Sequence, residues 1–123
     1  MKKALVIEDN EDNMELITFI LEKSGFITIR AENGNKGVEI AMKEMPDFIL
    51  LDIQLPDMDG TEVLKLIRKS NAMADIPIIA VTSYAMAGDR EWLLESGCNG
   101  YIEKPINPET ILSEINQVIG GRT

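Results

Sequence analysis

The sequence predicts an α/β fold in which five parallel strands alternate with helices. Five short apolar runs are separated by longer amphipathic stretches, an alternation typical of strands joined by crossover helices. The runs cover residues 4–7, 26–29, 48–51, 76–81 and 101–102. Those around Val6, Leu50 and Ile79 are apolar at consecutive positions, as expected for strands that helices cover on both faces. We therefore expect these three runs to form the centre of the sheet.

Capping residues and helix breakers mark the ends of the predicted helices. The first helix is expected to end at Ser24-Gly25 and the fourth at Ser96-Gly97, because glycine readily adopts the left-handed conformation that follows many helices. The second is expected over about residues 33–45, since Pro46 stops it. The last is expected to start at residues 107–109, where an N-cap asparagine precedes a proline in the first turn and an acid.

Length and charge describe a single acidic domain. A chain of 123 residues has room for one hydrophobic core, which we place at residues 1–119, with residues 120–123 as a flexible tail or the start of a linker. The net charge of −9 repels nucleic acid and anionic membrane surfaces.

The single cysteine and the absence of histidine exclude an internal disulfide and a Cys/His metal site. The apolar run at residues 4–7 is too short for a signal segment or a membrane span, so we expect a cytoplasmic protein.

Polar residues follow the predicted strands at the places where ligands bind in sheets of this kind. In a doubly wound parallel sheet, ligands lie beyond the carboxyl ends of the strands. The first strand ends in Glu8-Asp9, the third in Asp52 and the fourth in Thr82, and the fifth runs into Lys104-Pro105. We expect all of these residues to converge on one small pocket.

Three carboxylates in one pocket require a positive charge beside them. At roughly 4 Å, each pair repels by about 1 kcal/mol in water and about 4 kcal/mol at the dielectric of a protein surface. Lys104 supplies one charge, and Mg²⁺ fits as a second cation because it binds carboxylate and phosphate oxygens and keeps several waters. The alternative is that one acid is protonated. With both cations in place, Asp52 becomes a nucleophile toward phosphorus, while Glu8 and Asp9 hold the metal.

Four stretches of the chain carry motifs that together point to a known family. They are residues 4–10 (ALVIEDN), 46–60 (PDFILLDIQLPDMDG), 78–83 (IIAVTS) and 101–105 (YIEKP). In this order and spacing the chain resembles the response regulator receiver domains, the chemotaxis-Y-like family, of single-domain type, from about residue 3 to residue 119. The resemblance implies a flavodoxin-like (βα)5 three-layer sandwich with strand order 2-1-3-4-5. It also implies a receiver of a two-component or phosphorelay system, which is not an enzyme but assists its own phosphorylation and dephosphorylation.

The resemblance implies a role for each matched position. Asp52 is the phosphoacceptor, and Lys104 contacts a phosphoryl oxygen next to a Lys104-Pro105 peptide that is expected to be cis. Thr82 donates its hydroxyl to the phosphoryl group, and Tyr101 is the aromatic residue that turns inward as Thr82 moves. Phosphorylation then shifts the population between two arrangements of this region.

Mg²⁺ is the implied cofactor, and its ligands are Glu8, Asp9, Asp52 and the backbone carbonyl of Gln54. Glu8 stands where aspartate is also common, and its extra methylene favours Asp9 as the direct metal ligand. Tyr84, two residues beyond Thr82, is bulky enough to hinder an attacking water. We therefore predict a phosphoryl lifetime of minutes or longer.

The resemblance also implies protein partners. A histidine kinase or a histidine phosphotransfer protein donates the phosphoryl group. A downstream protein binds the face formed by the fourth helix, the fifth strand and the fifth helix, where the candidate contact residues are Met86, Trp92 and Tyr101. A weak or phosphorylation-dependent homodimer is a further expectation, whereas no nucleic acid or membrane partner is expected.

Three other classes of protein share features with this sequence. A phosphatase of the haloacid dehalogenase type also has a nucleophilic aspartate after an apolar strand, but it needs a second aspartate two residues on, where this chain has Gln54. A flavin-binding flavodoxin needs a phosphate loop where this chain has the acidic residues 8–12. The remaining alternative is a receiver-like interaction module that is never phosphorylated.

Overall fold

The computed structural model describes residues 2–83 and 87–120, and in these ranges five strands alternate with five helices. The strands are β1 (Lys3–Ile7), β2 (Ile27–Ala31), β3 (Phe48–Asp52), β4 (Ile78–Thr82) and β5 (Gly100–Glu103). The helices are α1 (Glu11–Lys23), α2 (Gly34–Glu44), α3 (Gly60–Arg68), α4 (Ala87–Glu95) and α5 (Ile111–Gly120), with a short 3₁₀ helix at Asn71–Met73. None of the helices in the described ranges is long and apolar enough to cross a bilayer.

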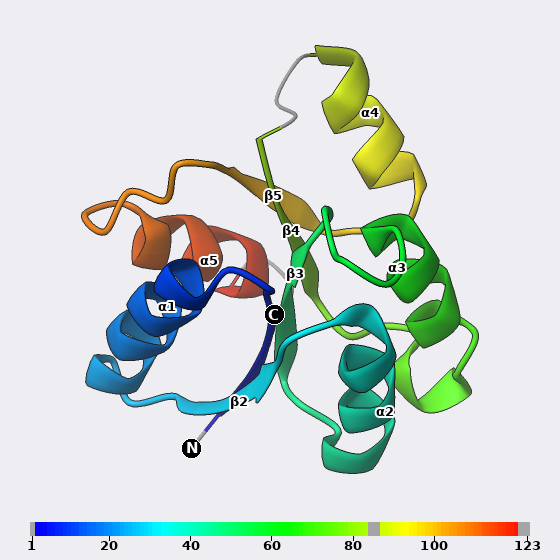
Figure 1. Ribbon diagram of the computed structural model, residues 1–123, viewed down its shortest axis with the longest axis horizontal. Helices are drawn as coiled ribbons and strands as arrows, with labels where there is room; N and C mark the ends of the chain where they lie inside the picture. The colour runs from blue at the N-terminus through cyan, green and yellow to red at the C-terminus, as the bar shows by residue number, and fades with distance from the viewer. Residues whose placement is uncertain (1, 84–86, 121–123) are drawn as a thin grey trace.

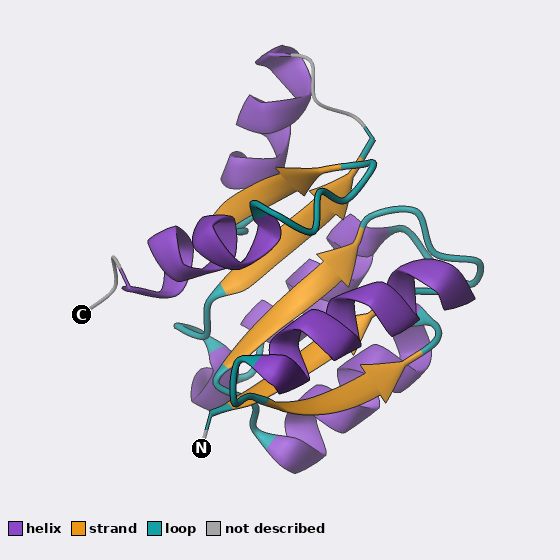
Figure 2. Cartoon of the chain, turned by 90° about the vertical axis from the view of Figure 1, so that its left-hand side faces the viewer, coloured by secondary structure: helices purple, strands orange, loops and turns teal. Residues whose placement is uncertain are grey.

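The strands form one sheet in the order β2-β1-β3-β4-β5, which confirms the predicted flavodoxin-like topology. Figure 2 shows that the strands run in the same direction. β1, β3 and β4 lie in the centre, and every residue of β3 and β4 is buried, as their consecutive apolar positions indicated. The edge strand β2 starts at Ile27, one residue later than the predicted run. Phe26 instead packs its ring against the edge of the Phe48 ring, with 5.4 Å between the ring centroids.

Helices α1 and α5 cover one face of the sheet and α2 and α3 the other (Figure 1), and a hydrophobic core lies on each face. Side chains alternate along β1, so Leu5 and Ile7 join the core under α2 and α3, whereas Ala4 and Val6 join the core under α1 and α5. α4 contributes Leu93 to the first of these cores and extends away from the sheet beside β5 (Figure 1). Because the strands are parallel, the loops after β1, β3, β4 and β5 all leave the sheet at one edge.

The helix ends follow the predicted caps except at α5. Gly25 (φ 94°) and Gly97 (φ 112°) take the left-handed conformation after α1 and α4, as predicted. α5 begins at Ile111 and not at residue 108. Residues 108–110 form a turn that the side chain of Asn107 caps, and the regular helix starts only after that turn.

The turn from β3 into α3 brings two backbone segments into close contact at Gly60. A Cβ atom at this position would lie 2.5 Å from the Cα of Ile53 and 3.0 Å from the backbone oxygen of Asp52. The amide of Gly60 also donates a hydrogen bond to the carbonyl of Ile53, at 2.9 Å. Backbone atoms cannot move aside as a flexible side chain does. The turn after Asp52 therefore requires glycine at position 60.

Gly60→Ala is expected to lower the free energy of unfolding by about 1–3 kcal/mol, the usual cost of overpacking. Gly88→Ala is the matched control, because Gly88 lies in α4 and, beyond its own helix backbone, no heavy atom of the described residues lies within 4 Å of an added Cβ. This control is expected to be neutral or to stabilise by up to about 1 kcal/mol. Urea unfolding followed by circular dichroism measures both variants, and equal stabilities would contradict the close packing at Gly60.

Candidate functional site

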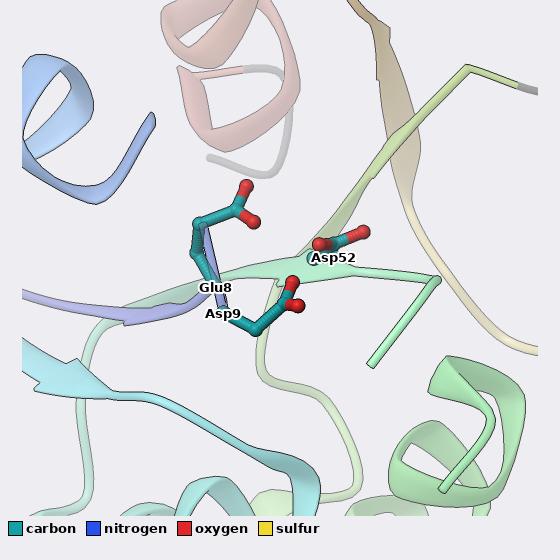
Figure 3. A group of neighbouring side chains, drawn as sticks. All are labelled: Glu8, Asp9 and Asp52. Atoms are coloured by element: carbon teal, nitrogen blue, oxygen red, sulfur yellow. The ribbon is translucent and has the colours of Figure 1, made fainter. Parts of the chain in front are cut away.

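Three carboxylates meet at the carboxyl edge of the sheet (Figure 3). Glu8 and Asp9 follow β1, and Asp52 is the last residue of the neighbouring strand β3. One carboxylate oxygen from each residue lies within 4.8 Å of the other two. Glu8 and Asp52 are buried and Asp9 is exposed. The cluster therefore has one side inside the protein and one side open to solvent.

Lys104, which follows β5, provides the positive charge beside this cluster. Its Nζ atom lies 3.2 Å from Oδ2 of Asp52 and 3.4 Å from Oε1 of Glu8. The lysine side chain is only 18% exposed, so water screens these ion pairs weakly. Oδ1 of Asp52 accepts a hydrogen bond from the amide of Gln54, at 2.9 Å. The peptide between Lys104 and Pro105 is cis, as the resemblance implied.

One lysine does not neutralise three acids, and burial makes the charged form of Glu8 unfavourable. Oε2 of Glu8 accepts a hydrogen bond from the amide of Asn10, at 3.1 Å, but the buried Oε1 accepts none from the described residues. Burial, followed by the nearby carboxylate of Asp52, raises the pKa of Glu8 to about 7. The same two causes raise the pKa of Asp9. The charged form of Glu8 is therefore disfavoured near neutral pH, and a further cation beside it would stabilise that form.

The donor set fits a hard divalent cation. All side-chain groups of the cluster are carboxylates, the ligands that Mg²⁺ prefers. The buried Oε1 of Glu8 accepts no hydrogen bond from the described residues. A bound cation would satisfy this oxygen. The cluster is therefore compatible with both alternatives predicted for it, a bound cation and a protonated acid.

The other residues predicted for the site lie around this cluster. Thr82 is the last residue of β4 and is 1% exposed. Tyr101 of β5 is opposite Ala80 in the sheet register and is half-buried. Because side chains alternate along a strand, Thr82 and Tyr101 lie on the same face of the sheet. Tyr84 and Met86 lie outside the described residues.

One further residue of the site was not singled out from the sequence. The hydroxyl of Ser83 donates a hydrogen bond to Oε1 of Gln54, at 3.4 Å, and so joins the loops after β4 and β3. Serine in a loop is too common to indicate such a role. Its position immediately after the strand that ends in Thr82 is the one signal that the sequence carries.

The cluster opens onto a pocket of about 260 Å³ between α1 and the end of β2. Its lining is mostly acidic and consists of Glu8, Asp9, Glu11, Met14, Glu15, Arg30 and Glu32. The guanidinium of Arg30 is paired with Glu15, at 2.9 Å. The acidic lining disfavours an anion in this pocket and favours a cation.

The strand order and the acidic pocket define the protein as a flavodoxin-like α/β domain with a carboxylate site at the carboxyl edge of the sheet. Comparison with known proteins gives the family. The profile of the response regulator receiver domain matches residues 4–116, so the chain belongs to this family. The polar-differentiation response regulator DivK of Brucella anthropi is 42% identical over 119 residues, which cover 97% of each chain. DivK of Brucella ovis is 41% identical over the same length.

Solved structures agree with this assignment. The chemotaxis response regulator CheY4 of Vibrio cholerae has a TM-score of 0.92 at 27% identity, over 96% of this chain and 98% of that chain. The receiver domain of a sensor histidine kinase from Pseudomonas aeruginosa has a TM-score of 0.87 at 33% identity, over 97% of this chain and 98% of that chain. That structure holds a magnesium ion in its active site cleft.

Membership of the family establishes the general function. Receiver domains are the phosphoaccepting domains of two-component signalling, bind Mg²⁺ at an acidic pocket, and interact with histidine kinases and downstream targets. This chain is accordingly a receiver domain of phosphorelay signalling. The alternative of a module that is never phosphorylated is not favoured.

The raised pKa values imply that the metal-free protein loses stability as the pH rises. The folded pKa of Glu8 is about 7 against 4.5 for the free group, so between these values the folded state binds a proton that the unfolded state releases. The free energy of unfolding therefore falls by about 3 kcal/mol for Glu8 alone as the pH rises across this window. Above the window it levels off. The raised pKa of Asp9 contributes to the same decrease of stability with pH.

Urea unfolding in EDTA at a series of pH values measures this slope. The Glu8→Gln variant cannot lose a proton, so its stability is expected to change much less over the same range. The shifted groups elsewhere titrate outside this window, because the pKa of Asp57 is lowered from 3.8 and that of Cys98 is raised from 9.0. The same slope in both proteins would show that Glu8 is not the titrating group.

Proposed function

We propose that Asp52 accepts a phosphoryl group from a histidine kinase or a histidine phosphotransfer protein in a Mg²⁺-dependent reaction. The position of Asp52 carries this proposal. It is a buried carboxylate at the end of a central strand, with Lys104 Nζ at 3.2 Å and two further carboxylates beside it. A nucleophile in this position faces groups that neutralise the charge of the incoming phosphoryl oxygens.

Each residue around Asp52 has a separate role in this reaction. An oxygen of Asp52 attacks phosphorus while the bond from phosphorus to the donor's imidazole nitrogen breaks, which forms an acyl phosphate and leaves an imidazole that takes a proton from solvent. The ammonium of Lys104 stabilises one phosphoryl oxygen, and the hydroxyl of Thr82 donates a hydrogen bond to another. The amide of Gln54, which donates to Oδ1 of Asp52 at 2.9 Å, orients the attacking carboxylate.

The ligands that we propose for Mg²⁺ are Glu8, Asp9, Asp52 and the backbone carbonyl of Gln54. When bound, Mg²⁺ supplies the positive charge that allows carboxylate and phosphoryl oxygens to approach one another. The buried Oε1 of Glu8, which accepts no hydrogen bond from the described residues, supports this assignment. The exposed Asp9 is proposed as the ligand that reaches the ion from the solvent side.

Thr82 and Tyr101 are the residues that we propose for the switch. When Thr82 turns toward the phosphoryl group, Tyr101 on the same face of the sheet is free to turn inward, and the phosphoryl group stabilises this arrangement over the other. A downstream protein then binds the face of α4, β5 and α5. The exposed Trp92 (44%) and Leu94 (49%) of α4 support such a contact. A weak or phosphorylation-dependent homodimer belongs to the same proposal.

We propose that the acyl phosphate is a signal and not a turnover intermediate. Gln54 occupies the place of the second acid of a haloacid dehalogenase phosphatase, and its amide does not transfer a proton at neutral pH. The domain thus assists its own phosphorylation and dephosphorylation without acting on another substrate. We place this exchange in the cytoplasm, as expected for a response regulator.

Incubation with acetyl phosphate and Mg²⁺ tests the proposal. Intact mass spectrometry is expected to show the gain of one phosphoryl group, which Asp52→Asn abolishes because the amide is not a nucleophile toward phosphorus. Asp47→Asn is the matched control, since Asp47 is an exposed acid at the opposite end of the same strand. No gain in the wild type with small donors and with a phosphotransfer protein, or an equal gain in Asp52→Asn, would rule the proposal out.

A further inference from the structure

The N-terminus of α2 is capped by a residue from a different part of the chain. Oδ1 and Oδ2 of Asp57, in the loop between β3 and α3, accept hydrogen bonds from the amides of Gly34 and Asn35, at 2.8 and 2.9 Å. The side chain of Asn33 satisfies the next amide, that of Lys36. The first turn of α2 contains no acidic residue. Asp57 therefore also supplies the negative charge that a helix N-terminus favours.

The contact between this loop and α2 continues at the residue after Asp57. A Cβ atom at Gly34 would lie 2.9 Å from Sδ of Met58 and 2.9 Å from Cγ2 of Val63 in α3. The first turn of α2 is thus packed directly on the loop and on α3. Hydrogen bonds and packing together hold the tip of the loop against α2.

The base of the same loop lies in the candidate site. The amide of Gln54 donates to Oδ1 of Asp52, at 2.9 Å, and Gln54 pairs with Asp59 in an antiparallel bridge. Oδ1 of Asp59 accepts a hydrogen bond from the amide of Thr61, at 2.9 Å, which caps α3. The loop is therefore a closed turn with its base at α3 and Asp52 and its tip at α2.

We propose that Asp57 is a positioning residue for the metal site. By anchoring the tip of the loop on α2, it fixes the backbone of Gln54, whose carbonyl is a proposed Mg²⁺ ligand. This inference rests on the Mg²⁺-dependent function proposed above. It gives an exposed carboxylate outside the cluster a role in metal affinity. A residue that only caps α2 would affect stability and leave metal affinity unchanged.

The test compares variants that lose the same charge in different places. Asp57→Ala removes both acceptors at the tip of the loop, and Asp57→Asn keeps one of them. Asp47→Ala is the matched control, because Oδ2 of Asp47 also accepts a backbone hydrogen bond, from the amide of Lys3 at 2.7 Å, at the other end of β3. Thermal unfolding without metal first shows that each variant is folded.

Calorimetric titration with Mg²⁺ gives the dissociation constant of each protein. Asp57→Ala is expected to weaken Mg²⁺ binding about tenfold, as loss of a group that orients a metal ligand does. Asp57→Asn is expected to have an intermediate affinity, and Asp47→Ala the affinity of the wild type. The rate of phosphorylation of Asp57→Ala by acetyl phosphate is expected to fall at low Mg²⁺ and to recover at saturating Mg²⁺.

Each other outcome counts against the inference in a recognisable way. Equal affinities in the wild type and Asp57→Ala would overturn it and leave Asp57 as a helix cap, while the proposed function stands. Equal weakening in Asp57→Ala and Asp47→Ala would also overturn it, because net charge alone would then explain the loss. A wild-type protein that binds no Mg²⁺ would contradict the proposed function itself, and the inference with it.

Discussion

Repulsion among the carboxylates of Glu8, Asp9 and Asp52 is the constraint on which the site at the carboxyl edge of the sheet depends. The sheet imposes it, because β1 and β3 are neighbouring parallel strands that end side by side. Lys104 offsets part of the repulsion. Burial, together with the nearby carboxylate of Asp52, raises the pKa of Glu8, and the buried Oε1 of Glu8 accepts no hydrogen bond from the described residues. Such a site gains stability when positive charge arrives, and this property makes it responsive to a cation.

The surrounding backbone holds these charges in place. Gly60 allows the chain to turn tightly after Asp52, and the amide of Gln54 orients the carboxylate of Asp52. Asp57 extends this support to α2, so that a helix on the far side of the loop shares in the geometry of the site. In contrast, only Leu93 of α4 belongs to a buried core among the side chains described there. The protein thus joins a firmly held reaction centre to a loosely packed helix on the face proposed for its target.

The fold and most of the site follow from local patterns in the sequence. Consecutive apolar residues mark the central strands, and parallel strands bring Glu8, Asp52 and Thr82 to one edge, so the site residues are predictable from strand ends. The contact of Asp57 with Gly34 is not predictable in this way, because 23 residues separate the two and no periodicity links them. The late start of α5 also lies beyond the sequence pattern, since the same Asn-Pro pair suits a helix cap and a turn. The raised pKa of Glu8 depends chiefly on how deeply its carboxylate is buried, and only the structure gives that burial.

The number of protons released when Mg²⁺ binds tests the charge-balance account most directly. Because metal ligands must be deprotonated, Mg²⁺ displaces the proton that the raised pKa keeps on Glu8 at mildly acid pH. Titration calorimetry in buffers of different ionisation enthalpy gives this number. The account requires release of close to one proton per Mg²⁺ at about pH 6 and close to none at about pH 8.5. Mg²⁺ binding without proton release at both pH values would contradict it.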